Sequence, residues 1–344
     1  MPKVSIIIRS IGRPELDDAL ASVASQQYSS IEVVVVDASG GRHAPVPHAC
    51  GTFPVVFVAG ESPRTRSVAA NAGLDAANGE YLTFLDDDDL ILPMHVAGLV
   101  EALEREPSYL VAYAHARLER EDGSVVLKRA QGYSRLLLFQ GCYLPIHAAM
   151  FRRNLVAQCR FDETLSLSED WDFWLQAAAV TDFLVVPQET AIYRCTLGRS
   201  GMDAPPDDPR GGEFLRNRAR VSEKWRAEGE RLVREMDNDF ADAVTLFESG
   251  DRAEALAVAE TILRRYPYHV ESLVLAGTVY ALRGGFEEAA RYFDRAVVES
   301  PEDGLAHFNL AQALGRLGRG EAARFHHRRA LELGHSPAAR GPHK

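Results

Sequence analysis

The chain has 344 residues, of which 46% are hydrophobic and 25% are charged, and its formal net charge is −11. This length favours two domains over one, and the composition is ordinary for a protein with a hydrophobic core. The acidic balance argues against nonspecific binding to nucleic acid or to an anionic membrane, but it permits a nucleotide that is bound through a cation.

The cysteines and the hydrophobic segments bear on the compartment. The four cysteines show no CxxC or metal-like spacing, and the N-terminal run MPKVSIIIRS leads directly into a strand pattern without a signal peptide. No apolar stretch approaches the roughly 20 residues that span a bilayer. We therefore expect a reduced, cytoplasmic protein with no transmembrane segment, with peripheral attachment at the inner membrane face as the alternative.

The first 130 residues alternate between strand and helix patterns. Short β-rich runs include Ile31 to Val36, whose four consecutive valines are typical of a strand buried on both faces. Helical patterns follow most of the runs. The expected strands cover residues 4–8, 31–36, 55–58 and 81–85, and the expected helices cover 14–23, 68–74 and 93–103. This alternation predicts an α/β fold with a parallel or mostly parallel sheet.

The pattern changes between residues 109 and 212. Residues 109–118 and 125–128 predict a hairpin around Asp122-Gly123. Further strands are expected at 147–151, 183–186 and 191–193, and a helix at 169–179. Residues 198–212 are rich in Gly, Pro and Asp and mark a domain boundary, with residues 202–212 either a mobile lid or a plain linker.

The acidic string FLDDDD at residues 84–89 closes the strand at 81–85. Four carboxylates at a strand end repel one another, and a hard divalent cation would neutralise them. The carboxyl end of a strand is also where open α/β sheets usually bind ligands. The alternative is a solvated acidic turn at the start of a helix.

A second candidate site is the string SLSEDWDFWLQ, residues 166–176. Ser168 occupies a good N-cap position, and Glu169 and Asp170 fall in the first helical turn, where the helix dipole stabilises acids. In the functional interpretation, one carboxylate is a general base beside an aromatic wall from Trp171 or Trp174. In the alternative interpretation both tryptophans are core residues. His147 is likewise either an acceptor-cleft residue or a hydrogen-bonded core or loop histidine.

The C-terminal third is helical and repetitive. Gly250, Gly284 and Gly318 recur at intervals of 34 residues, as do Ala255, Ala289 and Ala323. This period and its small residues resemble the tetratricopeptide repeat, with about three repeats. We expect the α/β domain at 1–212, a helical linker at 213–235 and a tetratricopeptide-repeat domain at 236–336.

The N-terminal blocks, in their order, resemble family 2 glycosyltransferases with a GT-A fold. The blocks are VSIIIRSIGRP, EVVVVDASG, RSVAANAGLDAANGEYLTFLDDDD and SEDWDFWL, and the resemblance covers about residues 3–200. It implies a Rossmann-like mixed sheet that binds a nucleotide-diphosphate sugar. It further implies transfer of the sugar to a saccharide or protein acceptor, usually with inversion and with a divalent cation, Mn²⁺ or Mg²⁺.

The resemblance also assigns roles to individual residues. Asp86 and Asp88 match the DxD element, with Asp88 on the metal and Asp86 near the donor ribose or sharing the ion. Asp37 and Arg66 match positions near the nucleotide, and Asp170 matches the proposed base. Glu169 and Trp171 would then lie on the acceptor side.

This chain departs from the family pattern at several positions. Arg9-Ser10-Ile11-Gly12 stands where Pro-Thr-Tyr-Asn is common, Ala38 replaces a second acid, and Cys195 replaces a frequent histidine. The sequence therefore leaves the donor base and the third metal ligand undetermined.

Two rival functions were considered. The first rival is a catalytically silent transferase domain with a repeat scaffold for protein binding. It is disfavoured because a silent site does not need the four acids Asp37, Asp86, Asp88 and Asp170, which lie far apart in the sequence. A nucleotidyltransferase usually relies on a Gly-rich basic loop after the first strand, and only Arg9, Gly12 and Arg13 hint at one. The expected function is a metal-dependent inverting glycosyltransferase whose repeats recruit the acceptor or a protein partner, as in surface-polysaccharide assembly.

Overall fold

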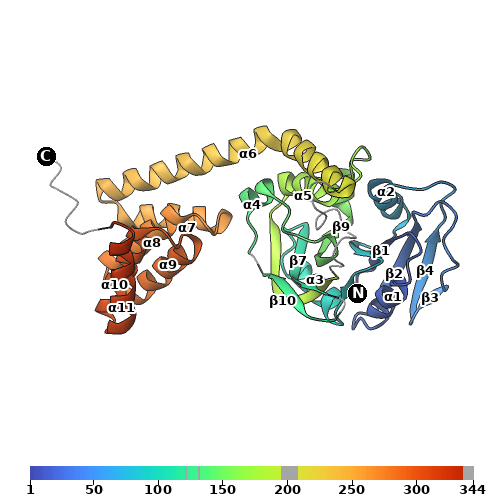
Figure 1. The fold of residues 1–344 in the computed structure, drawn as a ribbon, viewed down its shortest axis with the longest axis horizontal. Coiled ribbons are helices and arrows are strands. Elements are labelled where there is room, and N and C mark those ends of the chain that lie inside the picture. Colours follow the sequence, from blue (N-terminus) through green and yellow to red (C-terminus); the bar gives the residue numbers. More distant parts are fainter. Residues whose placement is uncertain (121, 131, 195–207, 336–344) are drawn as a thin grey trace. The chain divides into compact units, whose positions relative to one another are not determined.

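The computed structural model describes residues 1–120, 122–130, 132–194 and 208–335. The chain divides into two compact units, Met1–Ala227 and Glu228–Lys344. Helix α6, Pro209–Ser249, contains this division, which falls inside the segment expected as a linker. The two units are described separately below (Figure 1).

The N-terminal unit is built on one mixed sheet in the order β3-β4-β2-β1-β5-β9-β7-β10-β6, with β8 paired to β7. The neighbours β4, β2, β1 and β5 are parallel, and β9 runs antiparallel between β5 and β7. The strands are β1 Val4–Ser10, β2 Ile31–Asp37, β3 Ala49–Cys50, β4 Phe53–Val58, β5 Tyr81–Asp86, β6 Leu90–Ile91, β7 Val111–Glu119, β8 Val125–Arg129, β9 Ala149–Arg152 and β10 Phe183–Arg194. The expected mixed α/β sheet is confirmed.

Helices cover both faces of this sheet. The helices are α1 Leu16–Ala24, α2 Arg66–Ala76, α3 His95–Arg105, α4 Arg135–Gln140 and α5 Glu169–Val180, with short 3₁₀ turns at Ile146–Ala148 and Arg153–Ala157. Strand β1 shows the two-sided burial: Ile7 packs in the core with α2 and α5, whereas Ile6 and Ile8 pack in the core with α1 and α3. Because successive side chains point to opposite faces, its apolar run supplies both cores.

Several local features differ from the sequence expectations. The runs at 183–186 and 191–193 belong to one strand, β10, whose pairing with β7 shifts between Val186 and Ala191. Residues 146–148 form a 3₁₀ turn before β9. The short strands β3 and β6 and the helix α4 were not expected.

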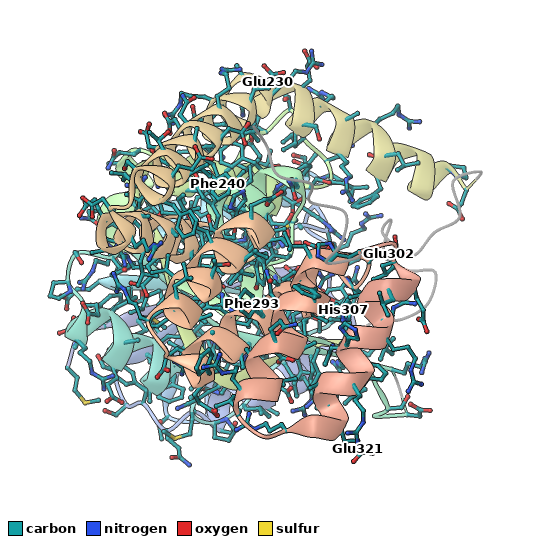
Figure 2. The ribbon with its side chains drawn as sticks, turned by 90° about the vertical axis from the view of Figure 1, so that its left-hand side faces the viewer. Glu230, Phe240, Phe293, Glu302, His307 and Glu321 are labelled. Carbon is teal, nitrogen blue, oxygen red and sulfur yellow. The ribbon has the colours of Figure 1, made fainter. Side chains whose placement is uncertain are left out.

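The C-terminal unit is a series of antiparallel helices, joined by tight turns, that begins with the end of α6. The further helices are α7 Arg252–Arg265, α8 Val270–Leu282, α9 Phe286–Glu299, α10 Gly304–Arg316 and α11 Gly320–Glu332. Gly250, Gly284 and Gly318 all have positive φ, as the turns within each hairpin require. At Gly277 a Cβ would lie 2.7 Å from the ring of Phe293, which Figure 2 labels among the helices of this unit. The 34-residue period therefore reflects both the turns and close helix packing.

Two further expectations concern membrane-spanning helices and the lid segment at 202–212. No helix in the described ranges is long and apolar enough to cross a membrane. The expected lid at 202–212 lies mostly outside the described residues, and Pro209–Gly212 already belong to α6.

Candidate functional site

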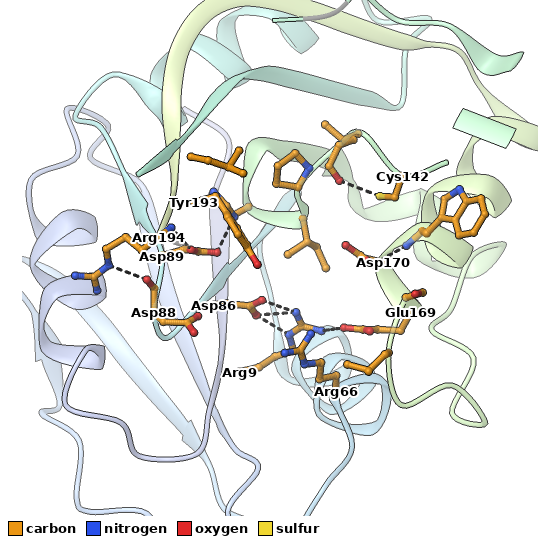
Figure 3. A pocket seen from close by; sticks show the side chains of 18 of the residues that line it. Arg9, Arg66, Asp86, Asp88, Asp89, Cys142, Glu169, Asp170, Tyr193 and Arg194 are labelled. Atoms are coloured by element: carbon orange, nitrogen blue, oxygen red, sulfur yellow. Dashed lines mark hydrogen bonds and ion pairs between the residues drawn. The ribbon is translucent and has the colours of Figure 1, made fainter. Parts of the chain in front are cut away.

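A pocket opens at the carboxyl edge of the sheet, where β1 and β5 end side by side. Arg9 at the end of β1 is in register with Asp86 at the end of β5. The pocket wall also includes the start of α5 and two side chains of α6, Phe214 and Arg218. Figure 3 shows Asp88 and Asp170 on opposite sides of this pocket.

Arg9 joins the two acidic clusters that the sequence singled out. Its Nε and Nη2 donate to Asp86 at 2.9 and 2.6 Å, and its Nη1 donates to Glu169 Oε1 at 2.7 Å (Figure 3). The side chain is only 6% exposed. Burial alone would lower the pKa of Arg9, but the carboxylates of Asp86 and Glu169 hold it above its ordinary value. The positive charge of Arg9 is therefore fixed between the two clusters.

The turn after β5 holds its other acids against Arg13. The guanidinium of Arg13 lies 3.1 Å from Asp87 and also bonds Asp88, while the backbone N–H of Ile11 donates to Asp87. Burial, then the nearby carboxylates of Asp89 and Asp86, raise the pKa of Asp88 to about 6. Asp88 is thus a carboxylate whose charge is only partly compensated by the protein.

Asp89 does not bond to Arg13 but forms a hydrogen bond with the end of β10. It accepts from the backbone N–H of Arg194 at 2.9 Å and lies 3.1 Å from Nδ1 of His147. His147 is 1% exposed and stacks on Tyr193. The interpretation of His147 as a buried, hydrogen-bonded histidine is therefore confirmed, and the residue also lines the pocket. Its place in an acceptor cleft stays a prediction.

Helix α5 presents its acids to the pocket from an unusual first turn. Ser168 stands at the N-cap position, as expected, but it has a left-handed backbone with φ of 60° and makes no side-chain capping bond. Asp170 Oδ1 accepts instead from the N–H of Trp171 at 2.8 Å. Burial, then the neighbouring Glu169, raise the pKa of Asp170. A strained non-glycine residue beside a perturbed acid is a frequent mark of a functional site.

The two tryptophans of α5 have different positions. Trp174 is completely buried in the core. Trp171 is 2% exposed, donates from Nε1 to Leu138 O at 2.6 Å, and contributes an edge to the pocket wall. The core interpretation holds for Trp174, while Trp171 serves both core and wall.

The two remaining predicted residues lie in different surroundings. Arg66 begins α2 and lines the pocket. Burial would lower the pKa of Arg66, but the charges of Glu169 and Asp86 hold it above its ordinary value. Asp37 ends β2 and is 1% exposed, and its oxygens accept from Ser39 and from the N–H of Gly41. Asp37 therefore orders its own loop and is not among the residues that line the pocket.

The sequence reading did not assign Arg9 and Arg13 to the site. A signal for Arg9 was available, since a single cation inside the apolar strand VSIIIRS needs buried acids as partners. Arg129, Phe214 and Arg218 also line the pocket, and no local pattern marks them. Within the described residues no group of three or more His, Cys, Asp or Glu side chains is close enough to hold a metal by itself.

Both ends of the chain are similar to known protein families. Residues 5–159 match the family "Glycosyl transferase family 2", and residues 240–303 and 275–336 match a tetratricopeptide repeat family. The uncharacterized glycosyltransferase YwdF of Bacillus subtilis is 27% identical over 199 residues, which are 56% of this chain and 74% of that protein. An uncharacterized glycosyltransferase of Haemophilus influenzae is 30% identical over 34% of this chain and 40% of its own length.

Solved structures were compared as well. Residues 1–349 of S. aureus TarS, in complex with UDP-GlcNAc, superpose with a TM-score of 0.47 and 16% identity, covering 97% of this chain and 93% of that one. The family match and the sheet order together give the N-terminal unit a GT-A fold. The chain thus carries a family 2 glycosyltransferase domain at its N-terminus, matched over residues 5–159, and tetratricopeptide repeats at its C-terminus.

Proposed function

We propose that this protein is a metal-dependent, inverting glycosyltransferase that moves a sugar from a nucleotide-diphosphate donor to an acceptor hydroxyl. The observation that carries the proposal is the placement of Asp88 and Asp170 on opposite sides of one pocket. One side offers acids and arginines to a diphosphate, and the other offers a base.

The donor end combines cations with a carboxylate. The side chain of Arg66 makes no hydrogen bond or ion pair with another described residue, and the side chain of Arg13 is about one-third exposed. Guanidinium groups suit the oxygens of a diphosphate because they donate in a planar fork. We assign Arg13 and Arg66 to the donor diphosphate.

The residues present fit one divalent cation at Asp88. Both oxygens of Asp86 are bonded to Arg9, whereas the raised pKa of Asp88 shows a carboxylate that a cation would stabilise. A bound Mn²⁺ or Mg²⁺ would supply charge stabilisation for the departing nucleoside diphosphate. In this assignment Asp88 holds the ion, and Asp86 orients Arg9 beside it.

Asp170 is the better of the two candidate bases. Glu169 is 2% exposed and its Oε1 is committed to Arg9, whereas Asp170 is half-buried on the pocket wall. A raised pKa makes the Asp170 carboxylate a stronger base than an ordinary aspartate, yet still ionised at neutral pH. Asp170 would accept the proton of the acceptor hydroxyl as that oxygen attacks the sugar on the face opposite the leaving diphosphate. A single displacement of this kind inverts the anomeric centre.

The repeats belong to the same proposal. Arrays of this kind present extended surfaces to peptides and proteins. We assign them the recruitment of the acceptor or of a partner protein.

The testing experiment is a calorimetric titration of UDP, dTDP and GDP, each with and without Mn²⁺. We expect metal-dependent binding of one nucleotide, lost in Asp88→Ala and retained in the control Asp17→Ala, an exposed acid of α1. Absence of binding for all three nucleotides to folded protein would contradict the donor assignment and favour the scaffold function.

A further inference from the structure

Two arginines of the pocket wall are not used by the proposed mechanism. Arg129 ends β8, and Arg218 lies on α6. Neither side chain makes a hydrogen bond or ion pair with another residue in the described ranges. By contrast, the side chains of Arg9, Arg13 and Arg194 in the same pocket all bond to acids. Arg129 and Arg218 are therefore positive charges that face one cavity and that no described acid balances, in a chain whose net charge is −11.

Both guanidinium groups border the turn that follows α4. A Cβ on Gly141 would lie 3.2 Å from Nη2 of Arg218, and the Arg218 guanidinium carbon is 5.7 Å from the centre of the Trp171 ring. The next residue, Cys142, is close to Arg129: burial and the Asp170 carboxylate raise the pKa of its thiol, and the charge of Arg129 opposes them. Arg129, Arg218 and Asp170 therefore surround the same turn.

These arginines are not the counter-ions of the base. Asp170 accepts from the N–H of Trp171, and the cations with the largest effect on its pKa are Arg9 and Arg66. Arg218 lies instead against the aromatic face of Trp171, which is one residue away from Asp170. Arg129 and Arg218 thus lie on the acceptor side of the pocket, close to the base but not bonded to it.

We propose that the acceptor carries an anionic group, a phosphate or a carboxylate, near the hydroxyl that is glycosylated, and that Arg129 and Arg218 bind this group. The inference rests on the proposed function and names the substrate class of the same site. A pair of guanidinium groups matches the oxygens of a phosphate or carboxylate, and such charge-assisted hydrogen bonds are about twice as strong as neutral ones. Binding the anion from two sides would fix the adjacent hydroxyl toward Asp170.

The experiment compares three small probes that share a sugar ring: glucose 6-phosphate, glucuronate and glucose. Each is titrated by ligand-observed NMR into the full chain saturated with UDP and Mg²⁺, or with whichever of dTDP and GDP binds instead, so that the donor cations are occupied. The variants are Arg129→Ala/Arg218→Ala and the control Arg216→Ala, an exposed arginine on the same helix that does not line the pocket.

We expect at least one anionic probe to bind ~10-fold or more tightly than glucose, as charge-assisted hydrogen bonds predict. This preference should vanish in the double variant and persist in Arg216→Ala. Whichever anion binds more tightly identifies phosphate or carboxylate as the natural group. Equal affinities for all three probes, or an anion preference that survives in the double variant, would overturn the inference.

The nucleotide arm separates this inference from the proposed function. The double variant should bind the nucleoside diphosphate with unchanged affinity, because neither arginine belongs to the donor end. If the nucleotide binds and the anion preference is absent, only the acceptor assignment fails. If no nucleotide binds to the wild-type chain, the proposed function fails first, and the acceptor assignment fails with it.

Discussion

Helix α5 carries two aspartates, two residues apart, in opposite surroundings. Asp172 is completely buried on the side that packs against α6, and it accepts from Trp225 Nε1 at 2.8 Å, from Lys224 Nζ at 2.9 Å and from Gln176 Nε2 at 2.8 Å. Asp170 lies on the pocket side and accepts only from the backbone of its own neighbour among the hydrogen bonds of the described residues. The side of α5 that packs against α6 thus supplies Asp172 with several hydrogen-bond donors, whereas the described part of the pocket side supplies Asp170 with one.

The difference separates an acid that holds the fold from an acid that is available for chemistry. A buried carboxylate with a full set of donors is stabilised as an anion and has no capacity for a new partner. A desolvated carboxylate with few donors becomes more basic and can accept a proton from a ligand. The following predictions test this division.

Asp170→Asn should produce the largest effect. Removing the base should lower the transfer rate by about 10²- to 10⁴-fold, which is the usual contribution of general base catalysis. The affinity for the nucleoside diphosphate should stay within a factor of about 2, since this carboxylate does not touch the donor end. Steady-state kinetics and calorimetry on the same preparation measure the two quantities, and loss of nucleotide binding would assign Asp170 a structural role.

Asp172→Ala should act on stability instead. The change leaves the indole N–H of Trp225 without its acceptor and removes one of the two carboxylates that contact the ammonium group of Lys224, the other being Asp162. We expect a loss of about 3 kcal/mol in the free energy of unfolding of the N-terminal unit. Urea unfolding followed by tryptophan fluorescence measures it. Asp75→Ala is the control: it removes a surface ion pair with Arg160 and should cost less than about 1 kcal/mol. Equal costs for both variants would refute the division.

Raising the pH should lower the stability of the N-terminal unit while it raises the transfer rate. Asp88 and Asp170 have folded-state pKa values of about 6, against 3.8 for an ordinary aspartate. An acid whose folded-state pKa is raised stabilises the fold below its unfolded pKa and loses that contribution as the pH rises through the folded value.

Without divalent cations, the unfolding free energy of the N-terminal unit should therefore decline between about pH 4 and pH 7 through these two groups. The transfer rate should rise over the upper part of the same interval, as the base loses its proton. Asp170→Asn should flatten the stability profile, and thermal melts across this interval give the answer. A profile unchanged by the substitution would show that the Asp170 pKa is not raised.

Ser168→Gly should give the smallest effect. Glycine adopts the left-handed conformation at φ of 60° without the steric penalty of a Cβ, so the unfolding free energy should rise by up to about 1 kcal/mol. Ser168→Val should lower it, because a β-branched residue is strongly disfavoured there. Thermal unfolding of both variants measures the sign, and a destabilising glycine would argue against strain at this residue.

Much of the fold could be predicted from local patterns. The mostly apolar strands β1, β2 and β5 were recognisable because buried parallel strands need hydrophobic residues on both faces. The repeats were recognisable because Gly250 and its equivalents must adopt positive φ at a fixed period. The two-residue strands β3 and β6 were not, since pairing of distant segments defines them and two residues hold no periodicity.

The site was predictable where the chemistry is concentrated in the sequence. The run at Asp86–Asp89 and the Glu169-Asp170 pair are visible as strings, and the pocket brings them to one edge. The partners of these acids are single residues in unremarkable surroundings, and only the folded chain shows that Arg9 reaches Glu169, 160 positions away. The contacts of Asp37 were also invisible, because its donors are the hydroxyl of Ser39 and backbone N–H groups of its own loop.

The forked contact of Arg9 has a consequence for how this site can vary between descendants of the same gene. Because one guanidinium group divides its hydrogen bonds between Asp86 and Glu169, losing either acid leaves a buried cation that the other acid must balance alone. Substitutions at the two positions will therefore not be additive. Arg9, Asp86 and Glu169 should therefore change together during evolution. A substitution of one of them destabilises the site unless a second substitution, far away in the sequence, restores the charge balance.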